Sequence, residues 1–275
     1  MHDYLKRQGA FSWSELLSRD LTGSVRFYRD LLGWEIVKKS MDGDPYYIVR
    51  VNGEDIASMM KMPVAVPPGV ATYWGTYITV FDVDAIANAV VPLGGTVVLP
   101  PQDIPGVGRF CSIQDPHGGV VSFISYSEEP SGDPDPAVYM HGSITWSGLQ
   151  SRTQSASVAF LTDLLEVQLT YFDVSGQPYY VIWPEDSDGI NADLPEPYQP
   201  KSSGVVQAPV WVPQNRAPFW LACVQVDDVD VTASKVAALG GSIVAHPADI
   251  PGIGRYCTIR DPQGGLISLI TYFSR

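Results

Sequence analysis

The sequence predicts an α+β protein that arose by tandem duplication, with two modules of eight strands each. The stretch from Tyr73 to Tyr126 returns as Phe219 to Tyr272, and 27 of the 54 aligned positions are identical without a gap. A looser upstream repeat keeps a constant offset of 133 residues. A repeat of this length is a whole module rather than a solenoid unit. We therefore expect module 1 at residues 1–126 and module 2 at residues 141–275. Residues 127–140, with three prolines, a glycine and four carboxylates, have linker composition.

The first half of each module is expected to form a βαβββ unit. In module 1, Gly9–Leu17 alternates apolar and polar residues, as a half-buried strand does. Ser24–Leu32 places its apolar residues on one helical face, and Gly33 is suited to end that helix. Three further strands are expected at residues 34–37, 45–51 and 55–60.

The second half of each module repeats this order. Thr76–Phe81 reads as a strand, and Asp82 or Asp84 is expected to cap a helix that runs to Leu93. Two strands then close around the Asp-Pro-x-Gly turn at residues 115–118, where proline presets the turn and glycine supplies positive φ. The whole chain is therefore expected to contain four βαβββ units.

Module 2 differs from module 1 by an insertion. Residues 195–218 carry six prolines and read as irregular, and the offset between the copies grows from 133 to 146 across them. A long loop of this kind is a lid, an interface arm or a tolerated insertion. Trp211 is the residue of interest within it.

Composition narrows the classes of function. No apolar run approaches the ~18–20 residues of a membrane span, and no secretory signal is evident at the start. Three cysteines do not make a disulfide framework, so the reducing cytoplasm is expected. The net charge is −13 with no basic patch, which argues against nucleic acid and anionic membranes as partners. An acidic surface attracts cationic ligands, or it serves only solubility.

Several motifs resemble the vicinal oxygen chelate superfamily, which includes glyoxalase I, extradiol dioxygenases and bleomycin-resistance proteins. They are Asp20-Leu21-x-x-Ser24-x-x-Phe27-Tyr28, Leu32-Gly33-Trp34, and the repeated Asp-Val-Asp, Leu-Gly-Gly and Asp-Pro-x-Gly. With DIPGVGR and DIPGIGR before the closing hairpins, the chain resembles tandem glyoxalase-like proteins. The resemblance implies that each pair of βαβββ units forms an open barrel-like sheet whose concave face holds a ligand. It says little about chemistry, because one fold hosts many functions.

Catalytic members of the superfamily hold a divalent metal on this concave face. We transferred the family's metal-ligand positions to this sequence one at a time. The residues at these positions are unsuited to a divalent ion, which prefers imidazole, carboxylate or thiolate. We therefore expect no metal and no other cofactor. The six positions are Trp13, Gly75 and Ser122 in module 1, and Trp146, Leu221 and Ser268 in module 2.

The concave faces are instead expected to be aromatic. A wall of tryptophan and tyrosine suits a planar or cyclic organic molecule, although such side chains can equally fill a barrel as ordinary core. The residues expected on these faces are Trp13, Tyr46, Ser122 and Tyr126 in module 1, and Trp146, Tyr179, Ser268 and Tyr272 in module 2.

Three charged residues complete the predicted site. Glu15 shares the face of Trp13, and among aromatics it could act as a general base, or it could be a salt-bridged rim residue. Arg109 and Arg255 follow the repeated Ile-Pro-Gly-x-Gly, where a guanidinium could clamp a ligand or bond loop carbonyls. Which face they occupy depends on strand register.

These observations leave three hypotheses for function. The first is a metal-free protein that binds a small organic molecule, neutral or cationic, between aromatic side chains. The second is a glyoxalase-like lyase or isomerase that uses Glu15 as general base, because module 2 has Gly148 there and duplicated genes often keep one active copy. The third is a non-catalytic interaction protein with filled barrels. In each case the two modules are expected to pack together, in a monomer or a homodimer.

Overall fold

A computed structural model describes residues 3–41, 44–64, 66–128, 140–165, 167–174, 177–183 and 203–273. It contains two eight-stranded mixed sheets, one in each half of the chain, which confirms the expected α+β tandem fold. Most of the expected linker, residues 129–139, lies outside the described residues. No helix among those residues is long and apolar enough to cross a membrane.

The first sheet is built from two βαβββ units. After a short 3-10 helix, η1 (Asp3–Lys6), the first unit comprises β1 (Phe11–Ser18), α1 (Leu21–Leu32), β2 (Glu35–Met41), β3 (Asp44–Val51) and β4 (Glu54–Lys61). The second comprises β5 (Tyr73–Thr79), α2 (Val83–Val90), β6 (Thr96–Ile104), β7 (Gly108–Gln114) and β8 (Val120–Tyr126). The strand order is β2-β3-β4-β1-β5-β8-β7-β6, so the two units meet where β1 pairs antiparallel with β5.

The second sheet repeats this topology in the order β10-β11-β12-β9-β13-β16-β15-β14. Its first unit is β9 (Ile144–Ser151), α3 (Gln154–Leu165), β10 (Gln168–Val174), β11 (Gln177–Trp183) and β12 (Ser203–Gln207). Its second is β13 (Phe219–Gln225), α4 (Val229–Val236), β14 (Ser242–Ile250), β15 (Gly254–Arg260) and β16 (Leu266–Tyr272).

The helix caps follow the sequence closely. Asp20 caps α1 by accepting a hydrogen bond from the Gly23 amide, and Gly33 ends the helix with φ 67°. Asp82, rather than Asp84, caps α2 through the Ala85 amide. That helix ends at Val90 instead of continuing to Leu93. A turn precedes Gly94, whose φ is 84°, a conformation that favours glycine.

The sequence expectation for residues 195–218 was wrong. The proline-rich stretch 195–218 was expected to be irregular, but its residues 203–207 form β12, which pairs parallel with β9 and antiparallel with β11. Gly204 pairs with Gly148 as Ser58 pairs with Glu15 in the first sheet, so the offset of 146 already applies at β12. The insertion therefore lies before β12, in residues 184–202, outside the described part of the chain. The strand was not predicted because it is only five residues long and lies between prolines. Its pairing with β9 and β11, which stabilises it, is not visible in the local sequence.

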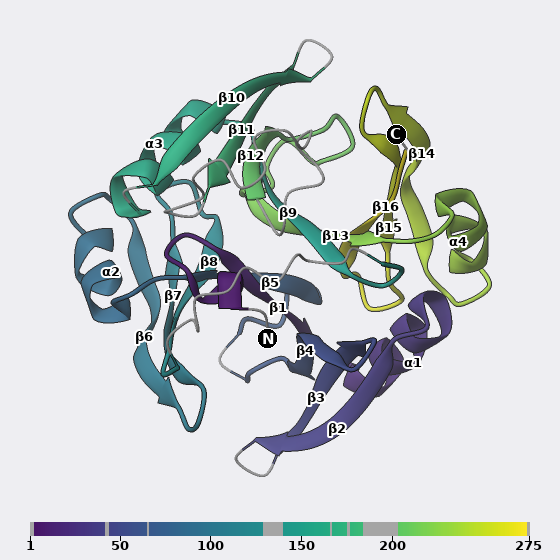
Figure 1. Cartoon of the computed structure of the whole chain (residues 1–275), viewed down its shortest axis with the longest axis horizontal. Helices are drawn as coiled ribbons and strands as arrows, with labels where there is room; N and C mark the ends of the chain where they lie inside the picture. The colour runs from purple at the N-terminus through teal and green to yellow at the C-terminus, as the bar shows by residue number, and fades with distance from the viewer. Residues whose placement is uncertain are drawn as a thin grey trace.

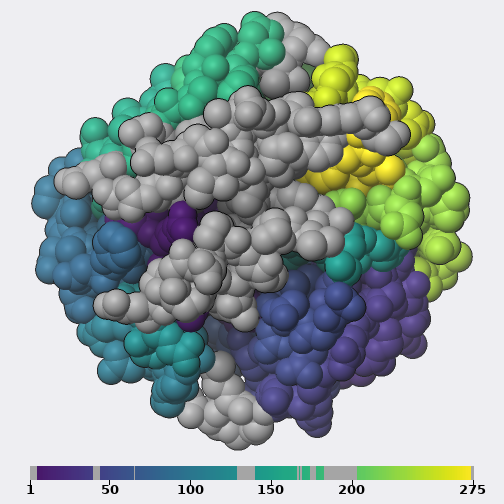
Figure 2. Space-filling view, viewed as in Figure 1, coloured from purple at the N-terminus to yellow at the C-terminus, as the bar shows by residue number. Residues whose placement is uncertain are grey.

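The two modules share their hydrophobic cores. One core joins α1 and the β1–β4 unit to buried residues of β13, α4, β15 and β16. The other joins α2 and the β5–β8 unit to α3 and buried residues of β9, β11, β12 and β13. Figure 1 shows the consequence: α1 lies beside α4, and α2 beside α3, on the periphery of a ring of four units. In Figure 2 the purple and light-green surfaces of the first pair meet at the right, and the blue and teal surfaces of the second meet at the left.

This pairing determines which faces can hold a ligand. The helices and the cores take up one face of each sheet, so the opposite face of each sheet, called here its concave face, is left for other contacts. Thr76 of β5 and Ser147 of β9 exchange a 2.9 Å hydrogen bond between the buried sides of the two sheets. The two concave faces therefore point away from each other.

Candidate ligand-binding cavity

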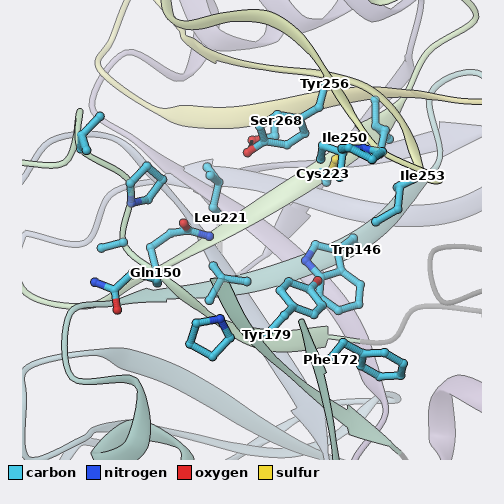
Figure 3. Close-up of a pocket in the computed structure, with 18 of the residues that line it drawn as sticks. Trp146, Gln150, Phe172, Tyr179, Leu221, Cys223, Ile250, Ile253, Tyr256 and Ser268 are labelled. Atoms are coloured by element: carbon cyan, nitrogen blue, oxygen red, sulfur yellow. Dashed lines mark hydrogen bonds between the residues drawn. The ribbon is translucent and has the colours of Figure 1, made fainter. Parts of the chain in front are cut away.

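A cavity of about 1030 Å³ opens on the concave face of the second sheet. Its wall takes residues from all eight strands of this sheet, β9 to β16, with residues after β12 and the β14–β15 turn at its edge. Figure 3 shows Trp146, Tyr179, Leu221, Cys223, Tyr256 and Ser268 arranged around this space. The volume lies at the upper end of the range of ~300–1,000 Å³ that is typical of sites for drug-sized molecules.

An aromatic pair forms one side of the cavity. The rings of Trp146 and Tyr179 stack with their centroids 5.3 Å apart and their planes 25° apart. The indole lies over two glycines: a Cβ on Gly148 would be 3.1 Å from its Nε1 atom, and a Cβ on Gly204 would be 3.0 Å from its Cζ2 atom. A Cβ at either glycine would crowd the indole, and one on Gly204 would also lie 2.3 Å from the Tyr180 carbonyl oxygen. The glycines therefore set the position of the aromatic surface.

A cluster of hydroxyl groups lies on the opposite side. The hydroxyls of Tyr256 and Ser268 are 2.7 Å apart, and Thr258 bonds to both, at 3.0 and 3.1 Å. Burial raises the pKa of Tyr256 to about 12, so the phenol stays protonated at neutral pH. Burial also raises the pKa of the neighbouring Cys223 thiol well above its usual range. A protonated thiol is a poor nucleophile, so Cys223 is a neutral wall residue.

The corresponding face of the first sheet contains a buried carboxyl group. Glu15 is 7% exposed and accepts hydrogen bonds from Ser58, at 2.8 Å, and from the hydroxyl of Tyr77, at 2.9 Å. Trp13 extends this series of hydrogen bonds by donating its indole N–H to Ser58 at 2.8 Å. Burial raises the pKa of Glu15, and the hydrogen bonds from Ser58, Tyr77 and Tyr46 oppose that rise. The carboxyl is thus held by donors on β3, β4 and β5.

Strand register explains why the two faces differ. Glu15 pairs with Ser58 in the first sheet, and at the same place in the second sheet Gly148 pairs with Gly204. Trp13 pairs with Tyr77, whereas Trp146 pairs with Cys223. The side chains of Glu15, Ser58 and Tyr77 in module 1 are therefore replaced in module 2 by two glycines and a cysteine. The substitutions come from three adjacent strands, so they remove volume at one point.

The structure brings together most of the residues that the sequence predicted for the site. Trp146, Tyr179, Ser268 and Tyr272 line the cavity of the second sheet. On the first sheet, Tyr46 hydrogen-bonds to Glu15, and Ser122 exchanges a 2.7 Å hydrogen bond with Ser112 on the same face. Tyr126 lies on β8 beyond Ser122, and burial raises the pKa of its hydroxyl to about 12.

Arg109 and Arg255 lie elsewhere, so the suggestion that they clamp a ligand does not fit the structure. Arg109 forms ion pairs with Asp84 of α2, at 2.7 Å, and with Asp103, at 2.8 Å. Arg255 makes the equivalent pairs with Asp230 of α4 and with Asp249. Both guanidinium groups therefore point to the helix side of their sheets. Each ties the first turn of a helix to a β-hairpin. The role is structural, as the sequence also allowed, but the partners are aspartate carboxylates instead of loop carbonyls.

The family's metal positions do not suit a metal in this chain. Trp13 pairs with Tyr77, and Tyr77 with Ser122, so the residue of β5 in register with the first-strand and eighth-strand positions is Tyr77 rather than Gly75. In the second sheet the same row is Trp146, Cys223 and Ser268. One thiol and a set of hydroxyls do not make a site for a divalent ion. Within the described residues, no group of three or more His, Cys, Asp or Glu side chains could hold a metal.

The sequence reasoning missed the residues that create the cavity. Gly204, Cys223 and Tyr256 were not among the predicted site residues, although Gly148 had been noted as the counterpart of Glu15. The signal for Gly204 and Cys223 was available in the repeat, because module 1 has the larger polar residues Ser58 and Tyr77 at these positions. Tyr256 stands where module 1 has Phe110. The missing information was the register that places Gly204 beside Gly148.

The comparisons with known proteins now establish the family. Residues 10–123 and 143–269 each match the model of the Glyoxalase/Bleomycin resistance protein/Dioxygenase superfamily. The chain belongs to this superfamily and carries two of its domains. It is 32% identical to CFP32 of Mycobacterium tuberculosis, a protein named as a glyoxylase, over 96% of this chain and 95% of that protein. It is 26% identical to the anthracycline biosynthesis protein DnrV of Streptomyces peucetius, over 95% and 93%.

Solved structures of the superfamily share the fold at low sequence identity. The Mn(II)-bound glyoxalase from Novosphingobium aromaticivorans matches with a TM-score of 0.58 and 15% identity, over 96% of this chain and 82% of that chain. Homoprotocatechuate 2,3-dioxygenase from Arthrobacter globiformis matches with a TM-score of 0.59 and 16% identity, over 97% and 80%. At these identities the likeness supports the arrangement of the strands and not the chemistry.

Proposed function

We propose that this protein binds a planar, multi-ring organic molecule in the cavity of its second module, without a metal ion. The observation that carries the proposal is the cavity itself, about 1030 Å³ in volume and bounded by the stacked rings of Trp146 and Tyr179. Planar ligands gain from such a surface because stacking contributes ~0.5–1.5 kcal/mol beyond the area that it buries. The name of the relative DnrV, an anthracycline biosynthesis protein, is in keeping with a multi-ring ligand.

The chemistry of the wall supports binding rather than reaction in this cavity. Its polar groups are mainly amides and hydroxyls, with two charged side chains, Arg152 and Asp173. Burial keeps Tyr256 and Cys223 protonated. The metal positions offer indole, thiol and hydroxyl groups, which favours a metal-free site. A filled and inert barrel, the third hypothesis from the sequence, is not favoured for module 2 because of the cavity volume.

A second candidate function, a lyase or isomerase with Glu15 as general base, is favoured by one observation. Burial raises the pKa of this carboxyl, which brings it closer to the range of a useful general base. The carboxyl group is only 7% exposed, however, and its two oxygens already accept hydrogen bonds from Ser58 and Tyr77, so a substrate has little access to it. We therefore rank a structural role for Glu15 above catalysis.

The proposal is tested by comparing matched tryptophans in the two modules. Hydroxypyrene, a neutral planar four-ring fluorophore, and a cationic acridine dye are titrated against the parent protein, Trp146→Ala and Trp13→Ala. We expect Trp146→Ala to weaken binding at least several-fold, because it removes the stacking surface. Trp13→Ala should bind like the parent. A preference for the acridine would show that the acidic surface also contributes.

A second variant guards against a misfolded tryptophan mutant. Cys223→Phe adds a ring at the cavity floor, where module 1 has Tyr77, and should reduce binding while far-ultraviolet circular dichroism stays unchanged. Loss of binding in Trp13→Ala but not in Trp146→Ala would move the site to module 1 and overturn the proposal. One zinc, nickel, iron or manganese per chain, retained through gel filtration, would overturn its metal-free part.

A further inference from the structure

Two hydroxyls of the cavity wall and a buried one behind them form a closed ring of hydrogen bonds. Tyr256 and Thr258 lie on β15 and Ser268 on β16, and the three oxygens are 2.7, 3.0 and 3.1 Å apart in pairs. Thr258 is fully buried and is not part of the cavity wall, whereas Tyr256 and Ser268 both line it. Any polar group of a ligand at this end of the cavity would therefore meet Tyr256 or Ser268.

The ring leaves these hydroxyls with spare acceptors but no spare donors. Each hydroxyl has one O–H hydrogen and two lone pairs. Three hydrogens supply the three bonds of the ring, so one lone pair on each oxygen is left unused. A ligand that donates a hydrogen bond can use such a lone pair at no cost to the ring. A ligand that can only accept must break one of the existing bonds, and the net gain of that exchange is small.

We infer that the ligand of the second module carries a hydrogen-bond donor, a phenolic hydroxyl or a ring N–H, which it donates to Tyr256 or Ser268. This inference rests on the proposed function and specifies the chemical class of its ligand. The neutral state of the phenol supports it, because burial holds the pKa of Tyr256 near 12. Module 1 lacks the arrangement, since Phe110 replaces Tyr256 and only Ser112 and Ser122 remain as a 2.7 Å pair.

The test compares hydroxypyrene with methoxypyrene, which has the same ring system but cannot donate. By fluorescence titration, the parent protein should bind hydroxypyrene about three- to tenfold more tightly, the range expected for one hydrogen bond. In Ser268→Ala the Thr258 hydroxyl still donates to Tyr256, and the Tyr256 hydrogen becomes free. The affinity ratio should therefore shift toward methoxypyrene, to equality or beyond. Tyr256→Phe should shift it in the same direction, because it frees one donor of the remaining pair.

The control is Ser122→Ala, the matched position in module 1, which should leave the ratio at the parent value. Comparing ratios between variants cancels the steric effect of the extra methyl group. Equal affinities in the parent, or a ratio that stays unchanged in both Ser268→Ala and Tyr256→Phe, would overturn the inference while leaving the cavity as the binding site. Failure of the proposed function has a different signature: neither pyrene binds, or binding responds to Trp13→Ala instead of Trp146→Ala.

Discussion

One phenol couples the two modules, and its removal should be costly. The hydroxyl of Tyr28, on α1, donates to Asp261 Oδ2 of the second module at 2.9 Å. It also accepts a 2.9 Å hydrogen bond from the indole N–H of Trp74. Tyr28 is fully buried, and its two partners are each 3% exposed. In Tyr28→Phe, water therefore has little access to either partner.

The expected loss follows from these two partners. A buried polar group that loses its hydrogen bond costs ~1–3 kcal/mol, so two such groups give about 2–6 kcal/mol. Asp261 keeps the backbone amides of Gln263 and Gly265 on its other oxygen, which favours the lower half of this range. Burial already raises the pKa of Asp261, and loss of the tyrosine donor should raise it further. A domain is typically stable by only ~5–15 kcal/mol, so the change is large.

Urea unfolding followed by tryptophan fluorescence and circular dichroism measures this loss. The matched control is Tyr171→Phe, whose side chain is exposed and whose stability should change by no more than ~0.5 kcal/mol. A loss below about 1 kcal/mol in Tyr28→Phe would refute the reasoning, because the partners would then have found other bonds. Two separate unfolding transitions in the parent protein would also contradict it, since the shared cores predict that the modules unfold together.

Two further outcomes are expected. Glu15→Gln should gain stability relative to the parent as the pH rises. Burial raises the folded-state pKa of Glu15 above its usual value of 4.5. The contribution of the carboxyl group to stability is therefore complete below pH 4.5 and is lost as the pH rises through the folded-state pKa. Urea melts between pH 4.5 and 8 check this, and a difference that does not vary with pH would contradict it. Gly108→Ala should unfold far more readily than Gly106→Ala. A Cβ on Gly108 would lie 2.0 Å from the Ser125 carbonyl oxygen, whereas a Cβ on Gly106, whose φ is 73°, would have no atom within 4 Å. Equal melting temperatures for these two variants would show that the β7–β8 pair yields easily.

The sequence by itself determined the repeat, the order of strands and helices, and the family. These features are local or periodic: apolar alternation marks strands such as β1, and the capping aspartate and terminal glycine mark the bounds of α1. It also indicated an aromatic concave face, because Trp146 and Tyr272 repeat Trp13 and Tyr126 at equivalent positions.

Only the tertiary structure placed a cavity on the concave face of the second sheet and decided which way the repeated arginines point. The cavity depends on Gly148, Gly204 and Cys223 standing side by side on three strands, and their alignment is fixed by strand pairing across more than 50 residues of chain. The helix-side position of Arg255 depends on register, since a shift of one residue would reverse its face. The shared cores arise because each helical face is covered by the other module. Such contacts join residues far apart in the sequence, and no local pattern records them.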